Sequence, residues 1–91
     1  MQQTIRRHPA TTTARWPWSR SLALAGEGDI LEVDEILFAS VQERCEELGI
    51  RPGTVLVCDT LRPGEVGIIL PDGTRARLPR HYAWFVAVEP L

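Results

Sequence analysis

The 91-residue sequence contains no lysine, because all ten of its basic residues are arginine. A phosphate-binding loop of the Walker type needs a lysine after its glycines, so this class of nucleotide site is excluded. No apolar run approaches the roughly 20 residues that cross a bilayer, and SLALAG (21–26) is shorter than the ~7–15 residue core of a secretory signal. With two cysteines and no export signal, we expect a cytoplasmic protein with reduced thiols, although the spacing leaves a disulfide between Cys45 and Cys58 open.

Charge is distributed unevenly along the chain. The residues before Glu27 include no acid and four arginines, namely Arg6, Arg7, Arg15 and Arg20. The remainder carries six arginines against twelve aspartates and glutamates, so a positively charged arm precedes an acidic body. An acidic body argues against nucleic acid as a partner.

Residues 1–20 show neither helical nor strand periodicity, hold two prolines and are rich in threonine and arginine. We therefore expect a mobile or partner-ordered arm over 1–20, followed by one folded domain over 21–91. Two large aromatic residues, Trp16 and Trp18, flank Pro17 in this arm, and exposing both to water is costly. They either fold back onto the body or dock onto a partner, and the sequence leaves both alternatives open.

Apolar periodicity predicts the first two elements of the domain. The alternation in ILEVDEI (30–36) predicts a strand with Leu31, Val33 and Glu35 on one face. One helical face over residues 38–48 is formed by Phe38, Val41, Cys45 and Leu48. Gly49 suits the left-handed position that ends a helix, and the next residue, Ile50, is then expected to pack back onto Cys45 in a Schellman motif.

Three turns divide the rest of the chain into short strands. The pairs Pro52-Gly53 and Pro63-Gly64 have the pattern of type II turns, and Pro71-Asp72-Gly73 predicts a hairpin. The expected strands are 54–61, 65–70, 74–78 and 85–90, with a short HYAW turn (81–84) before the last. These elements predict a mainly β domain with one helix: a small, partly open SH3-like barrel of five strands behind an irregular N-terminal arm.

Two segments, RCEELGIRPGTVLVC (44–58) and GIILPDGTRARLPRHYAWFVAVEP (67–90), resemble the FeoA family and the SH3-like C-terminal domain of iron-dependent repressors of the diphtheria-toxin-repressor type. The family's Leu-Gly-apolar-x-Pro-Gly signature is met by Leu48, Gly49, Ile50, Pro52 and Gly53. A looser later pattern is met by Gly73, Leu78, Ala83, Val86 and Val88. The likeness covers residues 22–90, but Cys45 stands where the family usually has leucine, and the arm is not part of the usual pattern.

The resemblance implies a non-enzymatic cytoplasmic accessory protein of ferrous-iron uptake that docks on a FeoB-type membrane transporter. An alternative is a small interaction or regulatory module that belongs to another assembly and is anchored by its arginine- and tryptophan-bearing arm. A third possibility is a relative of the repressor domain that binds proline-rich peptides near Tyr82 and Trp84.

No catalytic or cofactor-binding residues are expected, because no nucleophile, base and orienting group are grouped in the sequence and the two histidines fall in the arm and in a turn. The candidate metal ligands are Cys45, Cys58, His81, Glu43, Glu46 and Glu47. They lack the paired short spacings of a structural zinc site, so we predict no tight metal site and at most weak transition-metal binding. Both cysteines are expected to be buried as small apolar residues.

The candidate partner-binding residues are Trp16, Trp18, Arg75, Arg77, Arg80, Tyr82 and Trp84. The three arginines are expected to form a basic edge beside the two aromatic residues, since Trp, Tyr and Arg dominate protein interfaces. The alternative is a solvated strand face with the aromatics packed into the barrel mouth. Similarly, Glu46 and Glu47 in the last helical turn either pair with Arg44 or Arg51 or form an acidic patch for a basic partner.

Overall fold

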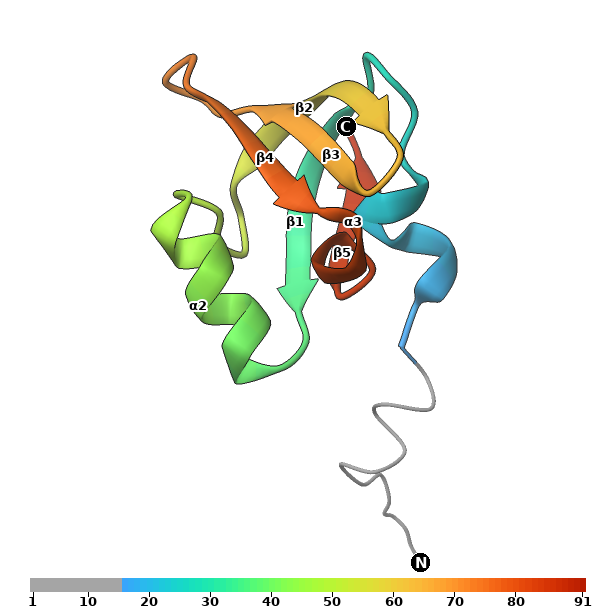
Figure 1. Cartoon of the computed structure of the whole chain (residues 1–91), viewed down its shortest axis with the longest axis vertical. Helices are drawn as coiled ribbons and strands as arrows, with labels where there is room; N and C mark the ends of the chain where they lie inside the picture. The colour runs from blue at the N-terminus through green and yellow to red at the C-terminus, as the bar shows by residue number, and fades with distance from the viewer. Residues whose placement is uncertain (1–15) are drawn as a thin grey trace, which may run out of the picture.

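The computed structural model describes residues 16–91, so residues 1–15 of the predicted arm lie outside the described part. Its strands are β1 (Ile30–Ile36), β2 (Val55–Arg62), β3 (Glu65–Ile69), β4 (Arg75–Pro79) and β5 (Val86–Pro90) (Figure 1). The helices are α2 (Ala39–Glu47) and α3 (Arg80–Ala83), and two short 3-10 turns, η2 (Trp18–Arg20) and η3 (Leu22–Leu24), precede β1. The prediction of a mainly β domain with five strands and one main helix is confirmed.

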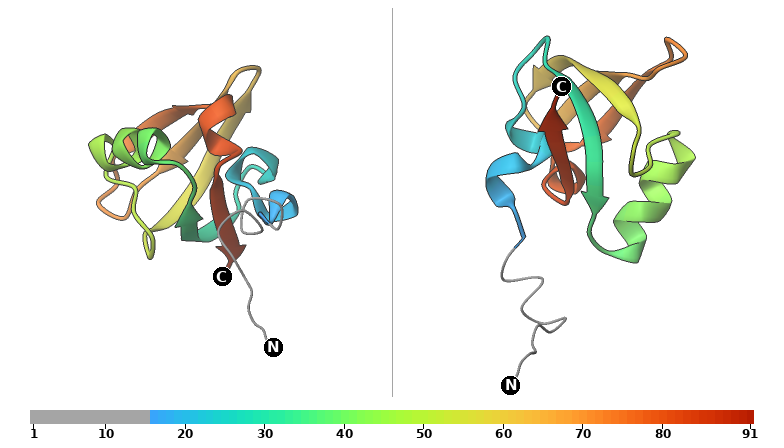
Figure 2. Two further views of the ribbon diagram at one scale, coloured as in Figure 1. Left: turned by 90° about the horizontal axis from the view of Figure 1, so that it is seen from below. Right: turned by 180° about the vertical axis from the view of Figure 1, so that it is seen from behind.

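The five strands form one antiparallel sheet in the order β4-β3-β2-β1-β5. The sheet curls strongly but does not close, because no pairing joins β4 to β5 within residues 16–91. The short helix α3 replaces the turn expected at HYAW and lies between these two strands (Figures 1 and 2). The barrel is therefore open on this side. The helix α2 lies beside the C-terminal end of β1.

The strand β1 departs from the predicted alternation at its end. Leu31 and Val33 face the core as expected, but Glu35 is exposed and Ile36 is buried instead. The pairing of β1 with β5 shifts register between Val33 and Glu35. Such a bulge inserts one extra residue, so the side chains after it change faces, and this keeps a carboxylate out of the core.

The helix α2 begins at Ala39, one residue later than predicted, and buries Val41 and Cys45. Its C-terminus is the expected Schellman motif, because the Ile50 amide donates to the Cys45 carbonyl at 2.8 Å and the Gly49 amide donates to the Glu46 carbonyl at 3.0 Å. Phe38 is not on the buried face. It occupies the position before the helix, and its side chain is 49% exposed.

The two Arg-Pro-Gly segments, residues 51–53 and 62–64, are turns between structural elements. Gly53 and Gly64 have φ values of 93° and 87°, which a residue with a Cβ adopts only with strain. Each turn leads directly into a strand, so these glycines set the position of β2 and β3.

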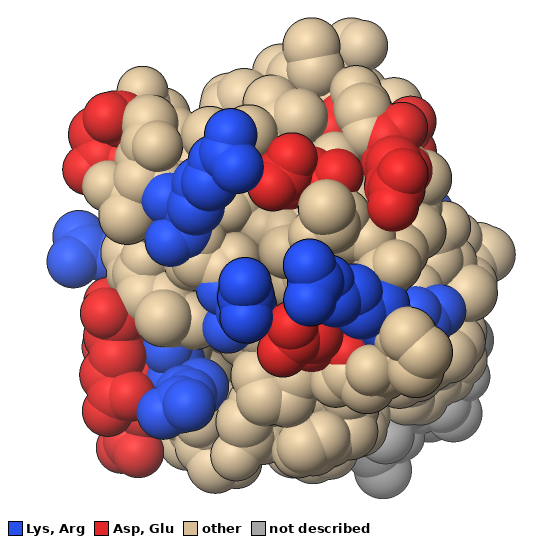
Figure 3. Space-filling model, turned by 45° about the horizontal axis from the view of Figure 1, so that its top comes forward, with Lys and Arg blue, Asp and Glu red and all other residues tan. Residues whose placement is uncertain are grey.

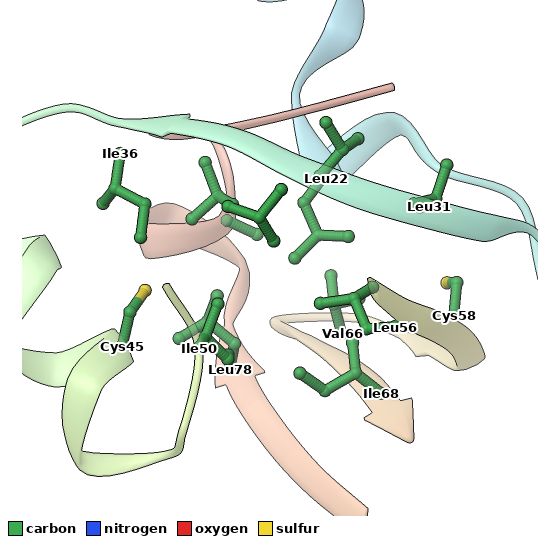
Figure 4. Close-up of a cluster of buried hydrophobic side chains, with 14 of the residues drawn as sticks. Leu22, Leu31, Ile36, Cys45, Ile50, Leu56, Cys58, Val66, Ile68 and Leu78 are labelled. Carbon is green, nitrogen blue, oxygen red and sulfur yellow. The ribbon is translucent and has the colours of Figure 1, made fainter. Parts of the chain in front are cut away.

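The core lies inside the curled sheet and draws on all five strands, on α2 and α3, and on η3 (Figure 4). Its fully buried side chains include Leu22 from η3, Leu56 and Cys58 from β2, and Leu78 from β4. Leu22 shows that the segment before β1 contributes to the same core as the strands.

Gly67 of β3 is buried and faces Thr60 of β2, whose Oγ1 would lie 2.4 Å from a Cβ added at Gly67. We expect Gly67→Ala to lower the free energy of unfolding by about 1–3 kcal/mol through this clash. Urea unfolding of the parent, Gly67→Ala, Thr60→Ala and the double variant measures the effect. The double variant should lose less than the sum of the two single losses, because Thr60→Ala removes the clashing oxygen. Additive losses would contradict this account.

Candidate protein-docking surfaces

The described end of the predicted arm folds back onto the body. Trp16 is only 4% exposed, and its indole Nε1 donates to the Trp84 carbonyl at 3.3 Å. The Ser21 hydroxyl donates to the same carbonyl at 2.7 Å. Of the two alternatives for Trp16, packing onto the body is therefore the one that the structure shows. The side chain of this candidate partner-binding residue is covered by its own domain.

Arg20 adds an electrostatic link between the arm and the sheet. Its guanidinium lies 2.7 Å from a Glu89 carboxylate oxygen and 3.7 Å from one of Asp34. All three groups are substantially exposed, so this pairing contributes little stability and mainly orients the segment.

Four aromatic side chains gather where the arm, the β1–α2 connection and β5 meet. We call Trp18, Phe38, Trp84 and Phe85 the aromatic patch. The ring of Trp18 lies 6.5 Å from that of Trp84 and 5.8 Å from that of Phe85, and Phe38 meets Phe85 edge to face at 5.1 Å. Trp18 is 43% exposed and Phe38 49% exposed, whereas Trp84 and Phe85 are partly buried against the core. The patch therefore offers water a connected aromatic surface, which is typical of protein interaction sites.

Phe38 holds its ring in the patch at a conformational cost. Its φ of 72° with ψ of 134° makes it the one residue other than glycine with positive φ within residues 16–91. A bulky side chain with positive φ is an outlier, and strain of this kind costs on the order of 1–3 kcal/mol. Backbone strain that keeps an apolar ring half-exposed favours a role for that ring outside the core.

Sequence reasoning missed Phe38 and Phe85 as surface residues. Phe38 fits the apolar face of the helix by spacing, and only the positive φ turns it away from the core. The phenylalanine at position 85 borders an apolar strand, which gives no sign that its ring meets Phe38.

The predicted basic edge is divided between two places. Arg80 points inward, and its Nη2 donates to the Ala23 carbonyl at 2.8 Å, so it fastens η3 to α3. Arg75 and Arg77 remain on the outer face of β4 with side chains 74% and 67% exposed. The expectation of one edge made of all three arginines is corrected, because the chain turns into α3 at Arg80.

Tyr82 and Trp84 also separate. The Tyr82 ring packs at 4.6 Å from that of His81, whereas Trp84 packs against Trp18. Both are partly buried. The two rings therefore pack against different aromatic partners.

The candidate metal ligands are dispersed. Cys45 and Cys58 are both free and buried and lie at opposite ends of the core (Figure 4), so the disulfide left open by their spacing is not formed. Burial raises the pKa of the Cys45 thiol to about 11. Burial and the nearby Asp29, Glu27 and Asp59 raise the pKa of Cys58. Within residues 16–91, no group of three or more His, Cys, Asp and Glu side chains is arranged to hold a metal ion.

The glutamates at the end of α2 are exposed. A Glu47 carboxylate oxygen lies 3.4 Å from the Arg44 guanidinium, three residues earlier on the helix. Of the expected ion pairs between these glutamates and Arg44 or Arg51, the one between Glu47 and Arg44 is therefore present. Glu46 borders a hollow of about 260 Å³ together with Ile36, Gln42, Ile50, Arg51 and Pro52.

The sheet order, the single main helix and the Schellman turn into β2 define a small SH3-like domain. The model of the FeoA domain family matches residues 20–90, which is most of the chain, so the chain belongs to this family. Membership implies involvement in ferrous-iron uptake. The comparison with curated proteins found no match.

Solved structures agree with the family assignment. An iron uptake regulatory protein (FeoA) is 26% identical with a TM-score of 0.70, over 78% of this chain and 94% of that one. The FeoA protein of Chlorobium tepidum is 23% identical with a TM-score of 0.69, over 78% of this chain and 70% of that one. A manganese-dependent transcriptional repressor shares the fold at 22% identity with a TM-score of 0.74, over 79% of this chain and 36% of that one.

No helix within residues 16–91 is long and apolar enough to cross a membrane.

The two arm tryptophans differ in burial, so their substitutions should differ in effect. We expect Trp16→Ala to lower the free energy of unfolding by about 3 kcal/mol, because the indole is removed from a packed site. Trp18→Ala should cost at most about 1 kcal/mol, because this ring is 43% exposed. Denaturant unfolding of both variants measures the difference, and equal losses would show that Trp16 is not packed as described.

The raised pKa of Cys45 predicts a loss of stability at high pH. Burial keeps the pKa of this thiol at about 11 in the folded state, whereas in the unfolded chain the thiol has its ordinary pKa of 9.0. Stability from this group is thus fully present below about pH 9 and is lost as the pH rises through 11. Urea unfolding at several pH values should show a steeper alkaline loss for the parent than for Cys45→Ala. Parallel pH profiles would refute this linkage.

Proposed function

We propose that this FeoA-family chain is a non-enzymatic cytoplasmic accessory protein that docks, through the aromatic patch, on the cytoplasmic part of a FeoB-type ferrous-iron transporter. The family match supports the iron-uptake role. The observation that carries the docking surface is the exposed pair Trp18 and Phe38, joined through Phe85 into one connected cluster.

Two features of the patch favour docking over simple packing. Its exposed rings come from segments far apart in the sequence that the fold brings together, so they form one surface of defined shape. In addition, the ring of Phe38 is presented by a strained backbone, and such strain is concentrated at functional sites.

The variants Phe38→Gly and Phe38→Ala distinguish the backbone strain at Phe38 from the contribution of its ring to binding. Glycine accepts φ of 72° without penalty, so we expect Phe38→Gly to be more stable than Phe38→Ala by about 1 kcal/mol or more. Both variants lose the ring, so both should bind the purified transporter at least about tenfold more weakly than the parent. Urea unfolding and a surface-based binding assay with the detergent-solubilised transporter measure the two effects.

Trp18→Ala should weaken binding to the same extent without unfolding the protein. Ile30→Ala is the matched control, because Ile30 is 53% exposed at the start of β1, whereas Phe38 follows the other end of this strand. Binding that is unchanged by Trp18→Ala and Phe38→Ala, or reduced equally by Ile30→Ala, would overturn the assignment of the patch. Absence of binding by the parent would overturn transporter docking itself.

The alternative proposal, a module of another assembly anchored by its arm, predicts a different outcome. The burial of Trp16 leaves Trp18 as the arm's exposed tryptophan among the described residues. Pull-down from the native cell with the full chain and with Trp18→Ala would then recover another complex and no transporter, with loss of that complex in the variant.

A further inference from the structure

The outer side of β4 is a free strand edge in the described part of the chain. The hairpin between β3 and β4 is closed by the Leu70 amide, which donates to the Thr74 carbonyl at 2.8 Å. Along an antiparallel ladder, residue pairs that exchange backbone hydrogen bonds alternate with pairs that do not. Leu70 and Thr74 are a hydrogen-bonded pair, so Ile68 and Ala76, two positions further along each strand, are one as well. The backbone N–H and C=O groups of Arg75 and Arg77 therefore point away from β3, where the sheet order places no further strand.

The face beside this edge is hollowed and lined by arginine. A depression of about 430 Å³ lies over β2, β3 and β4. Its lining residues are the three arginines Arg62, Arg75 and Arg77, one acid, Asp59, and the smaller residues Thr60, Gly67 and Ala76. Gly67 stands opposite Arg77 in the ladder, and the Thr60 hydroxyl lies against it from the other side. Figure 3 shows arginine side chains gathered over this side of the molecule, with acidic side chains between them.

These arginines are incompletely paired. Arg75 lies 3.7 Å from Asp59 and Arg77 lies 3.7 Å from Glu65, distances beyond those of charge-assisted hydrogen bonds. The guanidinium of Arg62 forms no hydrogen bond or ion pair with the described residues. Three of the six arginines of an otherwise acidic body thus converge on one hollow with most of their donors free.

The positive charge of the β4 edge limits which kind of strand can pair with it. A second copy of the chain paired through β4 would set the arginines of one strand against those of the other, and like charges across a strand pair destabilise it. An apolar strand would leave the guanidinium donors unused. An extended segment with alternating carboxylates satisfies both the backbone groups and the arginines.

We propose that β4 binds an acidic, extended segment of a protein partner, which adds to the sheet as a further strand and places its carboxylates against Arg75 and Arg77. The backbone hydrogen bonds supply the alignment and the arginines supply the selection for acidic side chains. This surface lies on different elements from the aromatic patch, so the proposal does not rest on transporter docking.

The test uses the full chain, isotope-labelled for NMR, and a capped peptide of about six residues with alternating valine and glutamate. We expect the amide shifts to change along β4 and the adjoining part of β3. Replacing each glutamate of the peptide by glutamine, or raising the salt to about 0.5 M, should weaken binding at least about tenfold.

Variants of the protein separate charge from backbone pairing. The double variant Arg75→Ala and Arg77→Ala should lose binding at least about tenfold, whereas Arg44→Ala with Arg51→Ala, which removes the same charge elsewhere, should lose much less. Arg77→Pro removes the outward N–H that strand addition needs, and proline is tolerated at such an edge position. Arg77→Pro should therefore bind more weakly than Arg77→Ala.

Four outcomes would overturn the proposal. Absence of binding to the acidic peptide, or shift changes on the aromatic patch instead of β4, would remove the site. Equal loss in the two double variants would reduce it to general electrostatic attraction. Equal binding by Arg77→Pro and Arg77→Ala would exclude strand addition. Because the transporter takes no part in this test, its result is independent of the function proposed above.

Discussion

The structure depends on how the gap between β4 and β5 is filled. A five-stranded sheet that curls without closing leaves its core open between its two outer strands, β4 and β5. Ser21, in the segment before β1, forms an antiparallel bridge with Ala87 of β5 at this opening. The segment before β1 covers this gap with Leu22, which is fully buried, and Arg80 holds it there through the Ala23 carbonyl. The Trp84 carbonyl accepts hydrogen bonds from Trp16 and Ser21 at the same corner. The residues before the sheet are thus part of the fold.

This way of closing the core also shapes the surface. Folding the arm against α3 and β5 brings Trp18 next to Trp84 and Phe85, and the strained Phe38 extends the cluster toward α2. On the outer face of β2, β3 and β4, Arg62, Arg75 and Arg77 line one shallow depression. One small domain thereby presents an aromatic surface and a basic strand edge on separate elements.

Much of the fold was predictable because turns are local. Proline and glycine set the backbone angles at positions 52–53, 63–64 and 71–73, and the strands between them follow from their apolar residues. The bulge in β1 was not predictable, because it arises where β1 must pair with β5 and still bury Ile36. Of the candidate partner-binding residues, Trp18, Arg75 and Arg77 are exposed, but Trp16 and Arg80 bond within the domain.

The sequence by itself determined the number of strands and their succession along the chain, the end of α2 and the family resemblance, because each depends on residues close together in the chain. Only the tertiary structure decided which tryptophan is covered, which arginine turns inward and which aromatic rings meet. These outcomes depend on contacts such as Trp16 to Trp84 and Phe38 to Phe85, between residues tens of positions apart. Local patterns carry no information about such contacts, since the free energy that selects them comes from burying the whole chain at once.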